Sequence, residues 1–236
     1  MRMRRKRWAR PELAACPYFI QEPEAHRGAW RELFARPEQP MQLELGCGKG
    51  VSTARMAHEN RDVNFVAVDL ISDVLGSARR NLARAYGEEP VDNAVLTAKN
   101  IMLIHEIFAP EDRFERIHIS FPNPWNERLK HRKRRLTHPR QLVQYRQFLR
   151  DGGEVWFKTD DDTLFEESLA YFRECGFSVK YLTRDLHASG FQPNYLTEHE
   201  IMFSEQGVRI KFLIAAKEAL PCETPPSVTS SGTENT

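Results

Sequence analysis

The stretch ELGCGKG, residues 44–50, follows a short apolar run and decides the fold prediction. Its glycines, Gly46, Gly48 and Gly50, alternate with larger residues, which allows a tight turn and lets a ligand press against bare backbone. Residues 51–59 have helical periodicity, so a strand–loop–helix unit is expected, with free N–H groups at the start of the helix. The spacing does not match a phosphate loop, and the third glycine comes one residue too early for a dinucleotide loop.

An acid, Glu44, lies two residues before the first glycine. A carboxylate at this place repels a pyrophosphate, but it suits a cationic amino group. S-adenosylmethionine has an ammonium at its methionine end and a sulfonium at its centre, so it is the predicted cofactor. The predicted contacts in the loop are Glu44, Gly46, Gly48 and Gly50. For Glu44 alone, the role of a satisfied strand-end acid is equally open.

Apolar runs rich in Val, Ile and Phe alternate along the chain with stretches of helical period. Strands are predicted at 42–45, 64–69, 94–98, 116–121 and 154–158, and helices at 51–59, 73–86, 139–150 and 164–175. This alternation predicts an α/β fold, a mostly parallel sheet with helices on both faces. Two more extended stretches follow at 178–183 and 208–215, and the last strand is expected to return antiparallel at the edge.

Two polar residues follow the next strands, at the edge where an open parallel sheet binds its ligand. Asp69 ends the second strand about 20 residues after the glycine loop, where an acid can accept both ribose hydroxyls. The order of loop and acid favours this role over a cap for the helix near residue 73. Asn100 follows the third strand and is predicted to contact the adenine amino group. An N-cap for a short helix at residue 102 is the competing interpretation.

The composition limits the class of protein. The chain has 236 residues, 41% hydrophobic and 28% charged, which is enough for one domain with a full core. The four cysteines lack metal-ligand spacing, and no signal peptide or membrane-length apolar run is found, so a reduced, cytoplasmic setting without a metal is expected. The net charge is only +1, yet cations gather at residues 2–10 and 128–135. Such local patches bind phosphates, so nucleic acid is a candidate partner.

The second basic segment follows a rigid Pro-Asn-Pro-Trp turn, residues 122–125, at the end of the fourth strand. This position favours a ligand-binding role for Asn123 over that of a plain turn residue. Trp125 is equally suited to stack on a base or to anchor the turn against the core. The cations suit phosphates better than base edges, because they cannot all face a base. The predicted phosphate contacts are Arg132, Lys133, Arg134 and Arg135.

Four motifs in order carry a family resemblance over roughly residues 40 to 215: the glycine loop with its acid, the Pro-x-Pro-Trp turn with its basic run, FKTD at 157–160 and TEHE at 197–200. Together they resemble the bacterial tRNA (guanine-N7)-methyltransferases. The resemblance implies a Rossmann-like class I methyltransferase fold with a seven-stranded sheet whose last strand is antiparallel. It also implies tRNA as partner and methyl transfer from S-adenosylmethionine to N7 of the variable-loop guanine, position 46 in the tRNA convention.

The resemblance also implies roles for particular residues. Asn123 stands where the family usually has a catalytic aspartate that also contacts the cofactor. Asn cannot act as a base, but N7 of guanine has a free lone pair and no proton to remove, so positioning can suffice. A carboxylate would add stabilisation of the positive charge that develops on the purine.

Substrate contacts are implied in two further segments. They are Asp160, Thr197, Glu198, His199 and Glu200, and, near the family's lysine four residues beyond the catalytic position, Glu127, Arg128 and Lys130. Helix caps compete for Asp160 and for Thr197 with Glu200. His199 replaces a residue that is often tyrosine in the family.

Two other functions stay open from the sequence. One is a methyltransferase acting on an exocyclic amino group, which the missing second proline after Asn123-Pro124 disfavours. The other is a non-catalytic tRNA-binding protein of the same fold, which the intact glycine loop and Asp69 disfavour. The expected organisation is a basic arm and lead-in helix over 1–39, a methyltransferase domain over 40–217 and a disordered tail over 218–236. Monomer and homodimer are both open.

Overall fold

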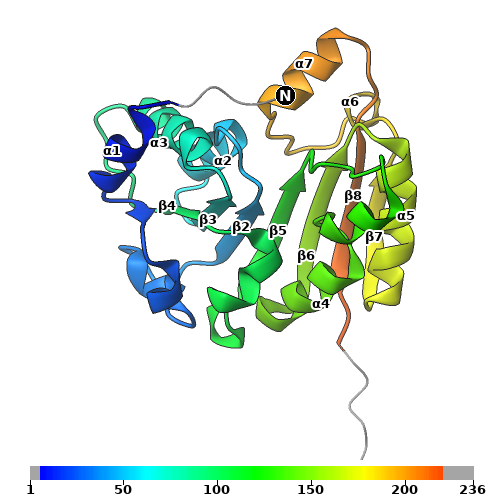
Figure 1. The fold of residues 1–236 in the computed structure, drawn as a ribbon, viewed down its shortest axis with the longest axis horizontal. Helices are drawn as coiled ribbons and strands as arrows, with labels where there is room; N and C mark the ends of the chain where they lie inside the picture. The colour runs from blue at the N-terminus through cyan, green and yellow to red at the C-terminus, as the bar shows by residue number, and fades with distance from the viewer. Residues whose placement is uncertain (1–5, 220–236) are drawn as a thin grey trace, which may run out of the picture.

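One eight-stranded sheet runs through the computed structural model, which describes residues 6–219 (Figure 1). The strands, in chain order, are β1 (Phe19–Ile20), β2 (Met41–Leu45), β3 (Asn64–Asp69), β4 (Ala94–Ala98), β5 (Phe114–Ser120), β6 (Leu149–Thr159), β7 (Phe177–Thr183) and β8 (Lys211–Lys217). They lie in the order β1-β4-β3-β2-β5-β6-β8-β7. β1 to β6 pair in parallel, and β8 is antiparallel to both β6 and β7.

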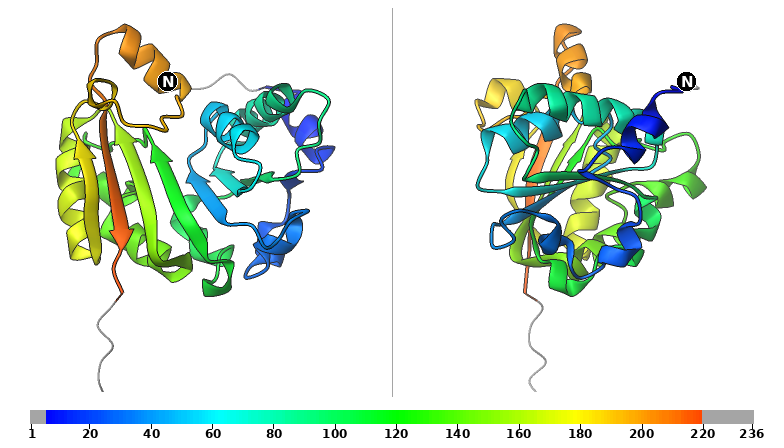
Figure 2. Two further views of the ribbon diagram at one scale, coloured as in Figure 1. Left: turned by 180° about the vertical axis from the view of Figure 1, so that it is seen from behind. Right: turned by 90° about the vertical axis from the view of Figure 1, so that its left-hand side faces the viewer.

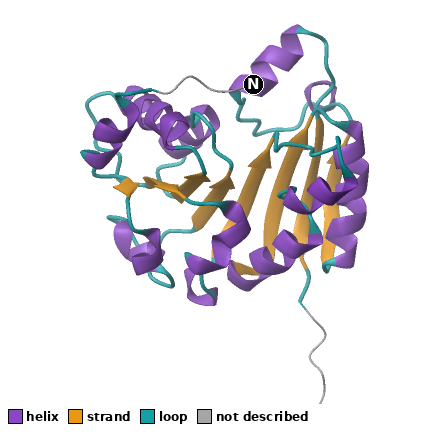
Figure 3. Ribbon diagram, in the orientation of Figure 1, coloured by secondary structure: helices purple, strands orange, loops and turns teal. Residues whose placement is uncertain are grey.

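Helices cover both faces of this sheet (Figures 2 and 3). The α-helices are α1 (Ala9–Ala14), α2 (Val51–Glu59), α3 (Ser72–Tyr86), α4 (Pro139–Phe148), α5 (Asp162–Glu174), α6 (Leu186–Ser189) and α7 (Glu198–Glu205). Short 3-10 helices are η1 (Pro23–His26), η2 (Trp30–Leu33), η3 (Ile101–Glu106), η4 (Pro110–Asp112) and η5 (Leu129–Arg134). No helix in the described part of the chain is both long and apolar enough to span a membrane.

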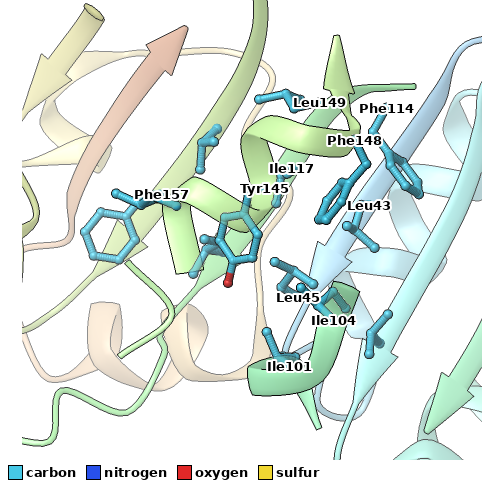
Figure 4. Packing of buried hydrophobic residues seen from close by; sticks show 14 of the residues in the cluster. Leu43, Leu45, Ile101, Ile104, Phe114, Ile117, Tyr145, Phe148, Leu149 and Phe157 are labelled. Atoms are coloured by element: carbon cyan, nitrogen blue, oxygen red, sulfur yellow. The ribbon is translucent and has the colours of Figure 1, made fainter. Parts of the chain in front are cut away.

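Alternate residues of the strands enter two different apolar layers. On one face, Leu43, Val66 and Phe157 pack with α4, α5 and η3 in a layer rich in Phe and Leu (Figure 4). On the other face, Phe65 and Leu96 pack with α1, α2 and α3. Because successive strand residues point to opposite faces, both sides of the sheet are buried, as the near-continuous apolar runs in the sequence indicate.

The predicted fold class is confirmed, and the antiparallel last strand with it, but the predicted strand count of seven is wrong. The added strand is β1, which pairs in parallel with β4 and lies in the stretch predicted as an arm and a lead-in helix. Two residues are too few to produce a period-two pattern, so local sequence gives no signal for it. The lead-in helix is α1, which packs on α3. The predicted disordered tail falls mostly on residues 220–236, outside the described residues.

The boundary between α4 and β6 also differs from the prediction. The helix was expected to continue to residue 150 and the strand to begin at 154, but α4 ends at Phe148 and β6 begins at Leu149. Leu149 is buried and pairs with Phe114 of β5, so a partner 35 residues away in sequence draws it into the sheet. Helix propensity is a weak signal beside such a tertiary contact.

The strand order places the candidate site. β2 lies in the middle of the sheet, between β3, which follows it in the chain, and β5, which comes later. The connections from neighbouring strands therefore leave in opposite directions at this point, and a crevice opens beyond the strand ends. The glycine loop, Asp69 and the residues after β5 all lie at this edge.

Candidate active site

The glycine loop turns from β2 into α2. The N–H groups of Gly46 and Cys47 both donate to the carbonyl oxygen of Val68 on β3, at 2.8 and 3.1 Å. Gly50 takes the N-cap position of α2 in the left-handed region, with φ 63° and ψ 30°, which favours a residue without Cβ. A Cβ built on Gly50 would lie 2.7 Å from the Cβ of Ala78 on α3. The loop therefore requires glycine here for both conformation and packing.

Asp69 closes the loop from the end of β3. Its Oδ2 accepts the N–H of Gly48 at 2.9 Å, and its Oδ1 accepts the N–H of Ile71 at 3.0 Å. The side chain is half-buried. It is not the cap of α3, because the N-cap position of that helix is held by Ile71. A carboxylate offers about four lone-pair positions, so two remain for a ligand hydroxyl pair.

Glu44 lies below the loop and is almost fully buried. Its carboxylate accepts the hydroxyls of Ser52, at 2.6 Å, and Thr53, both from α2. Burial raises the pKa of the Glu44 carboxyl, and the two hydroxyl donors and the charge of Lys158 oppose this effect. The two hydroxyls thus give Glu44 the hydrogen bonds expected of a structural strand-end acid. Glu44 also lines the cavity beside it, so both interpretations fit its position.

A cavity of about 280 Å³ joins these groups. Its walls include Glu44, Gly46, Gly48 and Asp69 on one side and Ser120, Phe121 and the start of α7 on another. Val51, Ile71 and Val74 supply apolar wall. The mouth is crossed by an exposed ion pair, Lys49 Nζ to Glu198 Oε1 at 2.7 Å, which joins the glycine loop to α7. Small-ligand sites combine such an apolar wall with a few convergent polar groups.

The Pro-Asn-Pro-Trp turn begins next to this cavity. Asn123 is exposed, and its Oδ1 accepts the N–H of Trp125 at 3.0 Å, as in an Asx turn. Phe121 and Trp125, on either side, have φ of 52° and 49°, unusual for residues with bulky side chains. Strained residues of this kind persist only where the surroundings hold them, and they cluster at functional sites. Asn123 itself is outside the cavity wall, two residues beyond Phe121.

The basic run forms η5, and its cations divide into two groups. Lys133 and Arg134 are exposed, as are Arg128 and Lys130. Arg135 is fully buried, so its prediction as a phosphate contact is wrong: its guanidinium binds the carbonyl of Pro124 and the carboxylate of Glu167 instead.

Two other side chains of this region bear on the predictions. Arg132 is half-buried and pairs with Glu167 as well. Trp125 packs edge-on against His131, with the Arg134 guanidinium 5.2 Å from its ring, which matches the anchoring interpretation. Glu127 is exposed in the loop before η5.

The TEHE segment begins α7 at the cavity mouth. Thr197 lines the cavity and also caps the helix, with its Oγ1 accepting the N–H of Glu200 at 3.0 Å. Glu198 and His199 are exposed and line the cavity. Glu200 is fully buried and receives Lys158 Nζ at 3.1 Å and Asn194 Nδ2 at 2.8 Å, so its prediction as a substrate contact is wrong. A buried carboxylate whose acceptors are filled has no face left for a base.

The other two predicted residues lie at strand ends. Asp160 follows β6 and is half-buried, and the cap of α5 is its neighbour Asp161, whose Oδ1 accepts the N–H of Leu164 at 2.6 Å. Asn100 is exposed, and its Oδ1 accepts the N–H of Met102 at 3.0 Å, which is the capping role of η3. Neither Asp160 nor Asn100 is among the described residues that line the cavity.

Sequence reasoning missed a polar row under the cavity. Glu44, His118 and Trp156 are paired across β2, β5 and β6, so their side chains share a face of the sheet. Burial lowers the pKa of His118 well below its usual range, helped by the charges of Arg116 and Lys158, so the ring is neutral at pH 7. Lys158 is buried as well, and burial lowers its pKa against the opposing charge of Glu200. The sequence signal that could have indicated His118 and Lys158 is a polar residue within a mostly apolar strand. Among the described residues no group of three His, Cys, Asp or Glu is placed to hold a metal.

Known proteins match the chain over most of its length. A family model described as "Putative methyltransferase" matches residues 38–213. The tRNA (guanine-N(7)-)-methyltransferase of Clostridium botulinum (strain Eklund 17B / Type B) is 54% identical over 220 residues, 92% of this chain and 100% of the relative. That of Clostridium beijerinckii (strain ATCC 51743 / NCIMB 8052) is 55% identical over the same shares.

Solved structures match the fold. One described as "Structure of an Antibiotic Related Methyltransferase" has a TM-score of 0.55 and 14% identity, over 77% of this chain and 88% of the other. This level of identity supports the fold alone, and it agrees with the predicted class I methyltransferase architecture. The sequence relatives confirm the family predicted from the four motifs. The chain belongs to the tRNA (guanine-N(7)-)-methyltransferase family.

Proposed function

We propose that the protein transfers a methyl group from S-adenosylmethionine to N7 of a guanine in tRNA, the variable-loop guanine at position 46, in the cytoplasm. Relatives 54–55% identical over 92% of the chain carry the corresponding name. The observation that carries the proposal is the cavity at the end of β2, which reaches from the glycine loop and Asp69 to Ser120 and Phe121, next to the turn that bears Asn123.

The cavity residues fit S-adenosylmethionine. Glu44 offers a carboxylate to the ammonium group, and Asp69 offers free lone pairs to the ribose hydroxyls. Gly46 and Gly48 leave bare backbone at the wall, and Ile71 and Val74 supply apolar surface for a flat ring. When bound, the cofactor supplies an electrophilic methyl group on a sulfonium sulfur. Two acids, Glu44 and Asp69, line the cavity, and the cation of the loop, Lys49, is paired with Glu198, which suits a cationic ligand better than a dinucleotide.

The role proposed for Asn123 is positioning. N7 of guanine carries a free lone pair, so methyl transfer to it needs alignment and no proton removal. The Oδ1 of Asn123 uses one lone pair for the Trp125 N–H, and the second lone pair and the amide N–H groups remain for a purine. Phe121, two residues before Asn123, lines the cavity, so the turn that bears this side chain begins at the cavity wall. Stabilisation of the charge on the methylated purine is assigned to Glu198 at the cavity mouth.

The proposed substrate contacts lie around the mouth of the cavity. Glu198, His199 and Thr197 line it, and Asp160 lies at the end of the neighbouring strand β6. A carboxylate there can accept the N1–H and N2–H donors of guanine. The exposed cations of η5 and its approach are the proposed phosphate contacts: Arg128, Lys130, Lys133 and Arg134.

The test is transfer of labelled methyl from S-adenosylmethionine to unmodified tRNA, with the product nucleoside identified by mass spectrometry. A tRNA that lacks the variable-loop guanine is the matched control. N7-methylguanine on the first tRNA and none on the second is the expected result. N7-methylguanine on both would place the target elsewhere in the tRNA, and an N2-methylated product would favour transfer to an exocyclic amino group.

A non-catalytic tRNA-binding role is the second candidate, because Asn123 lacks the carboxylate usual in the family. The same assay decides between the two. Cofactor binding without any methylated nucleoside would support this second candidate and contradict the proposed reaction.

A further inference from the structure

Arg135 is the most deeply buried cation of the basic run. Its side chain has 0% exposure, and all its partners belong to two places in the fold. Nε donates to the carbonyl oxygen of Pro124 at 2.7 Å, and Nη2 donates to Oδ1 of Asn126 at 2.8 Å. Nη1 donates to the carboxylate of Glu167 on α5. The planar guanidinium thus joins the turn that follows Asn123 to a helix on the face of the sheet.

The turn that Arg135 holds is strained and short of other internal support. Phe121 and Trp125 have positive φ, and two of the residues between them are prolines, which have no N–H to donate. A conformation of this kind needs outside contacts to fix it. The contacts fall close behind Asn123, at the backbone carbonyl oxygen of Pro124, the next residue, and at the side-chain oxygen of Asn126, three residues on.

A second set of contacts ties the same segments to α5. Nδ2 of Asn126 donates to Oδ2 of Asp161, at 2.6 Å, and the other oxygen of Asp161 caps the helix. Just after Arg135, the hydroxyls of Thr137 and Ser168 are 2.6 Å apart and buried. Because α5 packs into the apolar layer through Leu164, Phe165 and Phe172, it is a rigid support for both segments.

Glu167 extends this connection to the surface. Its two carboxylate oxygens pair with Arg135 and with Arg132, which belongs to η5 together with the exposed Lys133 and Arg134. The helix proposed to bind RNA phosphates and the turn proposed to hold the purine are therefore joined through one carboxylate and one guanidinium.

We propose that Arg135 is a positioning residue for the reaction: with Glu167 it clamps the Asn123 turn to α5, the helix that also holds Arg132 of η5. This inference rests on the proposed function for its kinetic test. Arg135 touches neither substrate nor cofactor, and its effect on the reaction passes through Pro124 and Asn126.

The central variant is Arg135→Lys, which keeps the charge but lacks the planar fork that reaches three acceptors at once. Asn126→Ala is the second variant: it removes an acceptor of Arg135 and the hydrogen bond to Asp161, both of which tie the turn to its support, and it leaves the pair of Arg135 with Glu167 intact. The matched control is Arg146→Lys. Arg146 likewise donates to backbone carbonyls, those of Gly176 and Glu218, far from the turn.

Two measurements are made on each variant. Under single-turnover conditions with saturating tRNA and S-adenosylmethionine, Arg135→Lys is expected to slow methyl transfer about 100-fold, the loss that a 1 Å misplacement can cause. Its tRNA affinity and the salt dependence of that affinity should match the parent. Asn126→Ala should give a smaller loss in the same direction, and Arg146→Lys should keep the parent rate.

The second measurement needs no activity. Hydrogen–deuterium exchange of the peptide spanning residues 122–128 should speed up in Arg135→Lys and not in Arg146→Lys, while peptides of β2 and α2 stay unchanged. Unchanged exchange of this peptide, or weaker tRNA binding with a reduced salt slope at an unchanged saturated rate, would overturn the clamp. A parent protein that transfers no methyl group would contradict the proposed function alone, and exchange would still decide on the clamp.

Discussion

Gly50→Ala tests whether the glycine loop is built as the structure shows. Gly50 has φ 63° and ψ 30°, and its Cβ would meet the Cβ of Ala78 at 2.7 Å and the Cα at 3.1 Å. Adopting the left-handed conformation costs a non-glycine residue about 1–2 kcal/mol. Forcing an extra methyl group into the packed contact of α2 and α3 adds about 1–3 kcal/mol. The expected total loss of unfolding free energy is therefore about 2–5 kcal/mol.

The matched control is Gly190→Ala. Gly190 has nearly the same backbone angles, φ 66° and ψ 12°, but a Cβ there has no heavy atom within 4 Å. It should show the backbone cost alone, about 1–2 kcal/mol. The difference between the two variants then isolates the contact with Ala78, about 1–3 kcal/mol or roughly 2–12 °C in Tm for a chain of this size.

Thermal and urea unfolding of both variants measure this difference. Adding Ala78→Gly to Gly50→Ala should recover part of the loss, because the Cβ of Ala78 is the nearest atom, although glycine in a helix itself costs about 1 kcal/mol. Equal stability of Gly50→Ala and Gly190→Ala would refute the close approach of α2 and α3 at the loop. Lower affinity for S-adenosylmethionine in Gly50→Ala, measured by calorimetry, should accompany the lower stability.

Three further predictions concern the site. Asn123→Asp should change the single-turnover rate less than about tenfold, because N7 needs alignment and no base; a gain of several orders of magnitude would contradict the positioning role. Replacing Lys133 and Arg134 together by Ala should weaken tRNA binding and lower the slope of log K against log salt by about 1.4–1.8, the share of two phosphate contacts. Exposed Lys180 on the edge strand β7 is the control, and its replacement should leave the slope unchanged. Burial raises the pKa of Glu44 above its ordinary value of 4.5, so the folded state binds this proton more tightly than the unfolded state. The free energy of unfolding therefore falls as pH rises from the ordinary pKa through the raised one. Measured by urea unfolding from pH 4 upward, the free energy of unfolding should fall less with rising pH in Glu44→Gln than in the parent. The affinity of the parent for S-adenosylmethionine should weaken as pH falls through the same range, because the carboxyl loses its charge.

Local sequence predicted most elements because their signals are local. Strands β3 and β4 and helix α2 begin and end where apolar periodicity predicted, since polar residues or glycine stand at or next to their ends. β1 was missed because a two-residue strand exists only through its pairing with β4. The end of α4 was misplaced because Leu149 prefers helix in isolation and is recruited by Phe114.

The candidate site was predicted where the chemistry follows from chain order. Glu44, Asp69 and the glycines lie together because the ends of neighbouring parallel strands meet at one edge of the sheet. Arg135 and Glu200 were assigned to ligands because they stand within motifs whose neighbours are exposed. Adjacent residues of a basic run have the same local sequence signal, so the run itself cannot indicate which cation is buried.

The amino-acid sequence by itself determined the α/β class, the turn at the glycine loop and the family, because these depend on periodicity, on backbone freedom at particular residues and on motifs in order. Only the tertiary structure decided which charged groups face the cavity and which hold it together. Arg135 meets Glu167, Lys158 meets Glu200, and Lys49 meets Glu198 across 32, 42 and 149 residues of chain. Burial and charge pairing depend on such distant partners, and folding alone brings them within hydrogen-bonding distance.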